Sequence, residues 1–401
     1  MNILVISQYY YPEQFKINDI CERLVENGHV VKVLTGLPNY PVGDIFNDYK
    51  QGRNRRETIN GVDVVRSYLV GRGSGSLRLA LNYLSFMVSS SLKALFLKEK
   101  FDLVFVYQLS PVLMAIAGII YKRKQHVPLY LYCLDLWPES IKVNIKNENS
   151  IVFKAVRNIS GSIYKQCDKI GVTSQPFIHY LNNVHGIEVE KITYLPQHGY
   201  DLFSKMGKES IDHEGINISY FGNIGKAQDF DSIINNIENI DSNIYFHIIG
   251  DGSEFNSLKQ KIDQLDLGHR IRLHGYKKAE ALVELYKLTD ICFLTLKPNS
   301  MIGDTLPSKM IEYLSVAKPI LAIARGSVES LIHESKCGYS VEYGNDADFV
   351  DKMKLLSNDA QLRRDMGQNG RAYFENNFTK ERFITKIESQ LYDLVGGTTN
   401  V

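Results

Sequence analysis

Residues 300–322, SMIGDTLPSKMIEYLSVAKPILA, bring together side chains suited to binding an anion and a diol. Asp304 and Glu312 are separated by seven residues, and Pro307 and Lys309 lie between them. Because proline suits the first turn of a helix, we expect a helix to begin there, with unpaired backbone N–H groups that attract a phosphate. Lys309 adds positive charge at this end, and Glu312, one turn later, can accept hydrogen bonds from two vicinal hydroxyls. The spacing predicts a ribonucleotide site, although this stretch alone also fits a surface helix with a lysine–glutamate pair.

Two loops in the second half of the chain are rich in glycine. The runs INISYFGNIG (216–225) and YFHIIGDG (245–252) each end in a turn whose glycines let the backbone approach a nucleotide closely. Neither loop is G-x-G-x-x-G, so a dinucleotide cofactor is not indicated. An ordinary turn glycine after a strand explains each loop equally well by itself. The residues expected to bind the nucleotide are Gly222, Asn223, Gly225, Lys226, Gly250, Asp251, Gly252, Leu306, Pro307, Ser308, Lys309 and Glu312.

Aromatic and amide side chains gather at the expected strand ends of the first half. Pyranose faces stack on aromatic rings, and sugar hydroxyls need fixed polar partners. These aromatic and amide side chains predict a sugar site at the strand ends, although Trp137 fits a core position equally well. The residues are Tyr10, Gln14, Asn39, Tyr40, Gln108 and Trp137, with the carboxylates of Asp135 and Glu139 beside them.

Short apolar runs alternate with amphipathic segments, a pattern typical of parallel strands joined by helices. The pattern predicts an α/β fold of two Rossmann-like, doubly wound domains with a hinge near residues 196–215. We expect domains at residues 1–200 and 201–378, followed by a helix in 379–401 that crosses back to the first domain. The expected strands are 3–7, 30–35, 62–67, 102–107, 129–134 and 169–173, and then 216–225, 245–252, 270–275, 290–296 and 318–324.

Charge is distributed unevenly, although it nearly cancels over the whole chain. Residues 1–200 contain 23 Lys/Arg and 16 Asp/Glu (net +7), and residues 201–401 contain 23 and 29 (net −6), which sum to the overall +1. Because the basic residues form no single stripe, the first half is expected to face an anionic membrane surface or phosphorylated lipid in preference to nucleic acid. Residues 77–98 approach membrane-spanning length but contain Arg78, Asn82 and Lys93, which predicts a helix with one apolar face.

Metal and disulfide sites are not indicated. The five cysteines are scattered without a C-x-x-C pair, which is typical of a reducing cytosol. The D-x-D patterns Asp229/Asp231 and Asp346/Asp348 lie at expected helix starts, where carboxylates serve as caps. The first residues, MNILVISQYYYP, read as a strand and not as a leader.

Taken together, several motifs resemble the family 4 retaining glycosyltransferases of the GT-B fold. Within that family the chain is most similar to the bacterial branch that adds N-acetylated amino sugars, including 6-deoxy sugars such as N-acetylfucosamine, during O-antigen or capsule assembly. The resemblance implies two domains facing across a cleft, with the acceptor bound by residues 1–200 and a UDP-sugar donor by 201–378. The motifs are SQYYYPE, GHVVKVLTGLPNYPVG, DLWPES, VTSQPF, YLPQ, FGNIGKAQ, IIGDG and TLPSKMIEYLSVAKPI, and they cover nearly the whole chain.

The resemblance also implies roles for individual residues. The paired acids of the family fall on Asp304 and Glu312, with Glu312 as the nucleotide-ribose carboxylate. Asp304 stands where a glutamate is usual. Lys309 and Lys226 match the donor-phosphate cations.

Two further positions depart from the pattern of the family. Gln14-Phe15 stand where many members carry two glycines in the first loop. Leu134, just before Asp135, replaces a histidine that addresses the 6-hydroxyl of the donor sugar. An apolar leucine suits a 6-methyl group better, because it offers a hydroxyl no polar partner.

The reaction implied by the resemblance is front-face substitution with retention at the anomeric carbon. No protein nucleophile, metal or cofactor is expected. The leaving diphosphate, stabilised by Lys309, Lys226 and backbone N–H groups, helps to deprotonate the acceptor hydroxyl. Asp135 and Glu139 orient acceptor or donor.

The expected acceptor is a glycan linked to undecaprenyl diphosphate, handled in the cytoplasm by a protein peripheral to the inner face of the cell membrane. Two alternatives stay open, namely a UDP-sugar 2-epimerase on the same fold and a non-catalytic nucleotide-sugar-binding partner of a polysaccharide assembly complex. The residues expected to contact anionic lipid, with the apolar face of 77–98, are Arg53, Arg55, Arg56, Arg72, Arg78 and Lys122-Arg123-Lys124.

Overall fold

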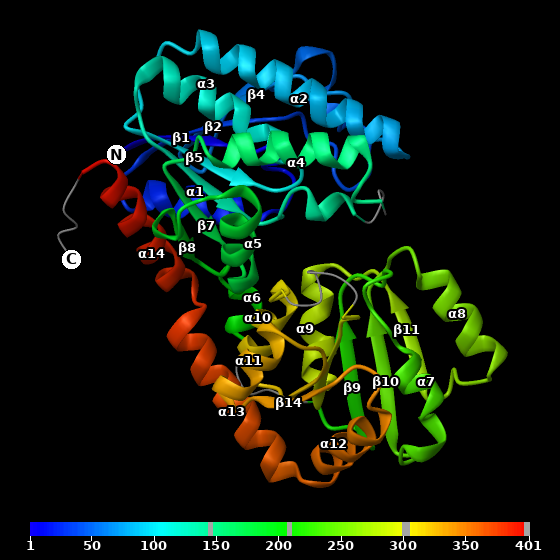
Figure 1. Ribbon diagram of the computed structural model, residues 1–401. Helices are drawn as coiled ribbons and strands as arrows, with labels where there is room; N and C mark the ends of the chain where they lie inside the picture. The colour runs from blue at the N-terminus through cyan, green and yellow to red at the C-terminus, as the bar shows by residue number, and fades with distance from the viewer. Residues whose placement is uncertain (143–146, 207–210, 299–304, 397–401) are drawn as a thin grey trace. The chain divides into compact units, whose positions relative to one another are not determined.

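Figure 1 shows a computed structural model, which describes residues 1–142, 147–206, 211–298 and 305–396. The chain forms two compact units. The N-terminal unit comprises Met1–Leu195 and Ile384–Val401, and the C-terminal unit comprises Pro196–Phe383. The two crossings therefore fall at 195/196 and 383/384, where boundaries at 200/201 and 378/379 were expected.

The N-terminal unit is built on an eight-stranded sheet in the order β3-β4-β2-β1-β5-β6-β7-β8. β3 runs antiparallel to β4, and the remaining neighbours pair in parallel. The central strand β5 is buried at every position, and its sequence LVFVYQ is apolar up to its last residue, Gln108. The strands are β1 (Asn2–Ile6), β2 (Val30–Thr35), β3 (Arg56–Ile59), β4 (Val62–Arg66), β5 (Leu103–Gln108), β6 (Leu129–Cys133), β7 (Lys169–Val172) and β8 (Ile192–Tyr194).

Helices cover this sheet, with α2 packed against α3 (Figure 1). Short 3-10 segments occur at Asn47–Gly52, Val112–Met114, Glu139–Ile141 and Val189–Lys191. The helices are α1 (Lys16–Glu26), α2 (Ser76–Phe96), α3 (Ala115–Gln125), α4 (Ile151–Tyr164) and α5 (Gln175–His185).

The last helix, α14 (Lys380–Leu394), completes the N-terminal unit from Ile384 onward. The carboxylate of Glu388 lies 2.8 Å from the His29 ring and accepts from the side chain of Asn27 at 3.0 Å. Tyr130, in the middle of the sheet, donates to the side chain of Gln390. These polar contacts tie α14 to the turn before β2 and to β6.

The C-terminal unit contains a six-stranded parallel sheet in the order β11-β10-β9-β12-β13-β14. Two apolar cores lie against it, one around Ile218, Phe246 and Phe293 and the other around Leu294 and Tyr313. The strands are β9 (Ile216–Phe221), β10 (Ile244–Ile249), β11 (Ile271–Gly275), β12 (Ile291–Thr295), β13 (Ile320–Ile323) and β14 (Gly338–Val341).

Helices α7 to α11 connect these strands, whereas α6 precedes β9, and α12 and α13 follow β14. A 3-10 segment occurs at Ile237–Asn239. The helices are α6 (Asp201–Ser204), α7 (Asp231–Asn235), α8 (Phe255–Gln264), α9 (Ala279–Leu288), α10 (Ser308–Ser315), α11 (Ser327–Ser335), α12 (Asp346–Asn358) and α13 (Ala360–Asn377).

The α/β fold with two Rossmann-like domains is confirmed, and each expected strand is present within a few residues. The pattern missed β3, β8 and β14, which have three or four residues each and, as RETI, ITY and GYSV, contain no continuous apolar run. The expected helix with one apolar face forms as α2, but that face points outward. The row of α2 that is buried against the unit carries Asn82 and Ser90 beside Phe86 and Ala94, while most of its leucines face outward.

Candidate active site

Asp304, the first of the paired acids, lies outside the described residues. The helix after it forms as expected, since α10 begins at Ser308 with Pro307 as its N-cap. Pro307 is extended, and the first turn of α10 follows it, with the Met310 N–H donating to the Pro307 carbonyl at 3.0 Å. Ser308 is exposed, and Leu306 is half-buried.

Lys309 extends from the first turn of α10 to the end of β9. Its Nζ donates to the Tyr220 hydroxyl at 2.5 Å and lies 4.1 Å from the centre of that ring. Burial lowers the pKa of Lys309 to about 7, because the loss of solvent disfavours the charged form of the side chain. A lysine poised in this way gains a full positive charge when an anion approaches.

Gly222 leaves the space that Lys309 occupies. A Cβ at residue 222 would lie 2.9 Å from Lys309 Nζ, and the φ of +134° is one that other residues rarely adopt. The Tyr220 hydroxyl donates to the Asn223 carbonyl at 2.6 Å, which holds the same loop from the other side. Lys226, two residues beyond Ile224, is exposed at the rim.

The two glycine loops lie directly against each other. A Cβ at Gly250 would be 1.8 Å from the Gly222 carbonyl oxygen, and one at Gly252 would be 2.3 Å from the Ile224 carbonyl oxygen. The Ile224 N–H donates to the Asp251 carbonyl at 2.9 Å. The structure therefore brings together most of the predicted nucleotide-binding residues at the carboxyl ends of β9 and β10, beside the start of α10.

Glu312 lies one turn beyond Lys309 on α10 and is 6% exposed. Its Oε2 accepts from the backbone N–H of Tyr200 at 3.0 Å. Gly199 makes this contact possible, because a Cβ there would be 2.5 Å from the ring of Phe374. The segment that holds Glu312 was missed from the sequence. The motif YLPQ ends just before it, at Gln197, and the glycine was its only signal.

In the N-terminal unit, Asp135 follows β6 and is held by Ser110. Its Oδ2 accepts from the Ser110 N–H at 3.0 Å and from the Ser110 hydroxyl at 2.8 Å. The indole N–H of Trp137 donates to the same hydroxyl at 3.0 Å. Burial raises the pKa of Asp135, and the two bonds from Ser110 act against that rise. Ser110, itself bonded to Trp137, thus holds the Asp135 carboxylate in place at the strand ends, where the carboxylate accepts hydrogen bonds.

Glu13 joins the loop after β1 to the loop after β2. The side chain is 3% exposed, and its Oε1 accepts from the backbone N–H groups of Asn39 at 2.9 Å and Tyr40 at 2.7 Å. Burial raises the pKa of Glu13 to about 7, although these backbone bonds oppose the shift. Glu13 is the glutamate of the motif SQYYYPE, and no pattern around it in the sequence predicts this role.

A buried amide network connects these loops to α2. Asn82 on α2 accepts from Gln8 Nε2 at 2.7 Å and donates to the Val70 carbonyl at 2.6 Å and to Asn39 Oδ1 at 3.3 Å. Arg72 donates its backbone N–H to Asn39 Oδ1 at 3.1 Å and its guanidinium to the Tyr9 hydroxyl at 3.3 Å. Arg72 therefore belongs to the strand-end loops, whereas the sequence suggested a lipid contact.

The predicted sugar-site residues separate into buried and exposed groups. Tyr10 is 1% exposed, so its ring packs in the core and presents no face to a sugar, which corrects that expectation. Asn39 and Gln108 are fully buried and hold loops, and Trp137 is nearly so. Residues that reach the surface are Tyr40 and Gln14, with Leu134 half-buried.

Glu139 is engaged within the unit. Its carboxylate forms an ion pair with Lys142 at 2.6 Å, and Lys142 also pairs with Glu148 at 2.8 Å. Glu139 is 9% exposed, and its expected role in orienting acceptor or donor stays a prediction. Its charge is offset by Lys142, so Asp135 is the better placed of the two for an uncompensated acceptor role.

Both D-x-D patterns lie at helix starts, as expected. Asp229 accepts from the Asp231 N–H at 3.0 Å where α7 begins, and Asn345 accepts from the Asp348 N–H at 3.2 Å where α12 begins. Across the part of the chain that the structure describes, no three His, Cys, Asp or Glu side chains converge as a metal site.

Two family models match the chain in succession. Glycosyltransferase Family 4 matches residues 17–198, and Glycosyl transferases group 1 matches residues 203–373. The first match lies in the N-terminal unit up to its last three residues, and the second lies within the C-terminal unit.

Curated relatives are distant in sequence. N-acetyl-alpha-D-glucosaminyl L-malate synthase of Bacillus anthracis is 25% identical over 213 residues, which span 53% of this chain and 54% of that protein. The chain thus matches about half the length of this relative. The putative colanic acid biosynthesis glycosyl transferase WcaI of Escherichia coli is 24% identical over 350 residues, 82% of this chain and 84% of that one.

Solved structures share the whole fold. Sucrose-phosphate synthase from Thermosynechococcus elongatus superposes with a TM-score of 0.76 at 15% identity, covering 98% of this chain and 99% of that one. HepE from Anabaena, in complex with UDP-glucose, gives a TM-score of 0.69 at 14% identity, covering 98% and 100%.

Proposed function

Because the chain is a glycosyltransferase of the GT-B fold whose two units match the family 4 and group 1 models, we propose that it moves a sugar from a UDP-sugar to a glycan acceptor with retention at the anomeric carbon. The acceptor is lipid-linked through undecaprenyl diphosphate or is an oligosaccharide, and the product enters a bacterial surface polysaccharide. The observation that carries this proposal is that Lys309 packs against Gly222 and lies one helical turn before Glu312 on α10.

The donor half of the reaction follows from charge and geometry. The first turn of α10 offers backbone N–H groups to a diphosphate, the missing side chain of Gly222 leaves the space beside it, and Lys309 supplies a cation at the same place. Glu312, held by the Tyr200 N–H, is the partner for the ribose hydroxyls. The UDP-glucose complex of HepE, a protein of the same fold, supports a nucleotide-sugar donor, and for this reason a UDP-sugar is proposed.

Catalysis in this proposal needs no protein nucleophile, metal or cofactor. Charge that develops on the leaving diphosphate is stabilised by Lys309 and the helix terminus, and the diphosphate takes the proton of the acceptor hydroxyl. Asp135, fixed by Ser110, orients the acceptor. Asp304 is proposed to lie near the donor sugar in place of the family glutamate.

An N-acetylated amino sugar, including the 6-deoxy forms, is the proposed donor sugar. The name of the relative in Bacillus anthracis refers to an N-acetylglucosaminyl transfer, which supports the N-acetyl group. Leu134 supports the 6-methyl group. Leu134→His is expected to improve use of a 6-hydroxylated donor relative to its 6-deoxy analogue, and an unchanged ratio would remove this part of the proposal.

The decisive experiment is a transfer assay after a thermal-shift screen of UDP-, GDP- and dTDP-sugars. With the stabilising donor and a lipid-diphosphate-linked acceptor, Lys309→Ala and Glu312→Ala are each expected to lower kcat/KM by about 10² to 10³. Lys354→Ala, an exposed lysine of α12, serves as the matched control. Near-normal transfer by both site variants would overturn the site assignment. Epimer formation without acceptor would identify a 2-epimerase, and donor binding without any transfer would identify a binding partner.

A further inference from the structure

Among the described residues of its unit, none covers the apolar stripe on the outer face of α2. Six residues at spacings of three and four, which share one side of a helix, are each between 44% and 75% exposed: Leu77, Leu81, Leu84, Val88, Leu92 and Leu95. A stripe of this length spans about 27 Å at 1.5 Å per residue. Contiguous apolar surface on this scale marks an interaction site.

The inner face of α2 fixes this stripe in place. Asn82 is fully buried and bonded to Gln8, Asn39 and the Val70 carbonyl, and Ser90 donates to the Phe86 carbonyl at 2.6 Å. By length and composition α2 could cross a membrane. Its buried amide bonds instead hold it against the sheet, so a bilayer would be contacted by its outer face alone.

Charges on and around the stripe are positive. The 21 residues of α2 contain Arg78 and Lys93 and no Asp or Glu. Partial burial lowers the pKa of Lys93, and the nearby positive charges of Arg56 and Arg55 add to this shift. Two lysines that were expected to contact lipid interact with other groups of the protein instead. Lys122 pairs with Asp168 at 2.6 Å, and Lys124 donates to the carbonyls of Leu95 and Leu97 at the end of α2.

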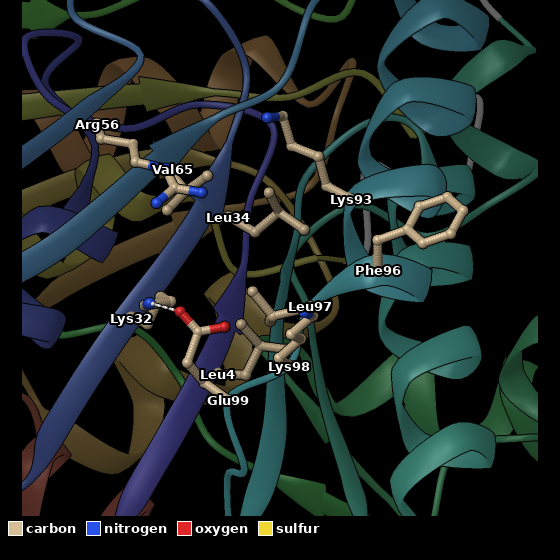
Figure 2. Close-up of a pocket in the computed structure, with 10 residues that line it drawn as sticks. All are labelled: Leu4, Lys32, Leu34, Arg56, Val65, Lys93, Phe96, Leu97, Lys98 and Glu99. Atoms are coloured by element: carbon tan, nitrogen blue, oxygen red, sulfur yellow. Dashed lines mark hydrogen bonds and ion pairs between the residues drawn. The ribbon is translucent and has the colours of Figure 1, made fainter.

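A cavity of about 430 Å³ opens where α2 ends (Figure 2). Its wall is formed by neighbouring positions of β1, β2 and β4, because Leu34 pairs with Val65 and Lys32 pairs with Leu4 in the strand register. Its full lining is Leu4, Lys32, Leu34, Arg56, Val65, Lys93, Phe96, Leu97, Lys98 and Glu99.

The cations of the cavity differ in whether a carboxylate pairs with them. Lys32 is matched by Glu99 at 2.6 Å and Asp63 at 2.8 Å. Arg56 and Lys93 project from opposite walls, from β3 and α2 (Figure 2), and within the described ranges neither forms an ion pair. Apolar walls with unmatched cations suit an amphiphile that carries a phosphate.

We propose that the outer stripe of α2 lies in the interface of an anionic membrane and that the cavity at its end binds the phosphate of one anionic phospholipid through Lys93 and Arg56, with an acyl chain along Leu34 and Val65. This proposal rests on the proposed function, because contact with the membrane brings the enzyme to a lipid-linked acceptor. Asn82, near the strand ends, and Phe96, at the cavity, are about 21 Å apart along the helix axis, so the lipid site is separate from the acceptor loops.

A second copy of the chain fits the stripe less well. In an antiparallel pair of α2 helices centred near residue 86, Arg78 of one copy would face Lys93 of the other. In a parallel pair, Arg78 would face Arg78 of the second copy, and Lys93 would face Lys93. Either arrangement places like charges together with no acid on the helix to offset them. Anionic lipid satisfies the apolar stripe and the cations at once.

Vesicle flotation tests the surface. The full chain is expected to float with vesicles that contain phosphatidylglycerol and to bind pure phosphatidylcholine vesicles at least about fivefold more weakly. Leu92→Glu should abolish binding, whereas Leu355→Glu on α12, with a similar exposure of 49% against 53%, should leave it unchanged. Equal binding to both vesicles, or full binding by Leu92→Glu, would overturn the proposal.

Native mass spectrometry tests the cavity separately. One phosphatidylglycerol per chain is expected, lost in Lys93→Glu and retained in Lys354→Glu. A lipid adduct that persists in Lys93→Glu refutes the cavity assignment. A dimer that Leu92→Glu dissociates in lipid-free solution shows that the stripe pairs with a second copy, which refutes the lipid assignment. None of these readouts needs transfer activity, so failure of the proposed function leaves them interpretable.

Discussion

The carboxylate of Glu13 accepts a hydrogen bond of 2.7 Å from the backbone N–H of Tyr40, which ties the loop after β1 to the loop after β2. Burial raises the pKa of Glu13 to about 7, above its value of about 4.3 in an unfolded chain. The folded state therefore binds more protons between these pH values. The free energy of unfolding should fall by about 3 kcal/mol as pH rises from 4 to 8.

Glu13→Gln keeps an acceptor for the Asn39 and Tyr40 N–H groups but does not titrate, so it should flatten this part of the pH dependence. Glu13→Ala leaves both buried N–H groups unpaired and should destabilise the unit by about 2 kcal/mol at pH 7. Urea unfolding at several pH values measures both effects. An unchanged slope in Glu13→Gln would show that another group is responsible.

Ser110 is expected to control the acid side of the activity profile. Its two hydrogen bonds lower the pKa of Asp135, so Ser110→Ala, which removes the one from the hydroxyl, should raise that pKa further. A higher pKa means that the carboxylate forms only at higher pH, and kcat/KM should then begin to rise at a higher pH than in the native enzyme. Ser110→Thr retains the hydroxyl and is the control. Superimposable pH profiles for Ser110→Ala and the native enzyme would argue against this role of Asp135.

Donor binding should take up a proton at Lys309. Its pKa of about 7 in the free protein must rise when a diphosphate lies beside it. Binding should therefore weaken as pH rises above 7, by up to about tenfold per pH unit until the bound-state pKa is reached. Calorimetry in buffers of different ionisation enthalpy measures the proton uptake directly. Lys309→Arg, which stays charged, should bind donor with no such pH dependence, and persistence of the dependence there would exclude Lys309 as its source.

Gly222→Ala should impair the donor site without any change of charge. Its Cβ would lie 2.9 Å from Lys309 Nζ, at a φ of +134° that alanine rarely adopts. We expect the dissociation constant for UDP to rise at least about tenfold, a loss of about 1.4 kcal/mol. Gly268→Ala, where a Cβ meets nothing within 4 Å, is the matched control. Equal UDP affinity in both variants would mean that Lys309 does not need its present position.

Much of the donor site was predictable because it is local in sequence. The helix start at Pro307, the turn from Lys309 to Glu312 and the two glycine loops each depend on neighbouring residues and on strands long enough to show their pattern. Their meeting at one sheet edge follows from the rule that parallel strands share their carboxyl ends. Short strands such as β3 and β14 carried no such signal.

What the tertiary structure decided was which side chains are buried and what each one contacts. Tyr10 and Tyr40 are both tyrosines after strands, yet one packs in the core and the other is exposed. Glu13, Asn82 and Tyr200 gained roles through partners between 26 and 112 residues away. The periodicity of α2 fixed the spacing of its leucines but not the side they would take. Buried amide bonds from Asn82 set that orientation, because a buried polar group must find partners, and only the folded chain supplies them.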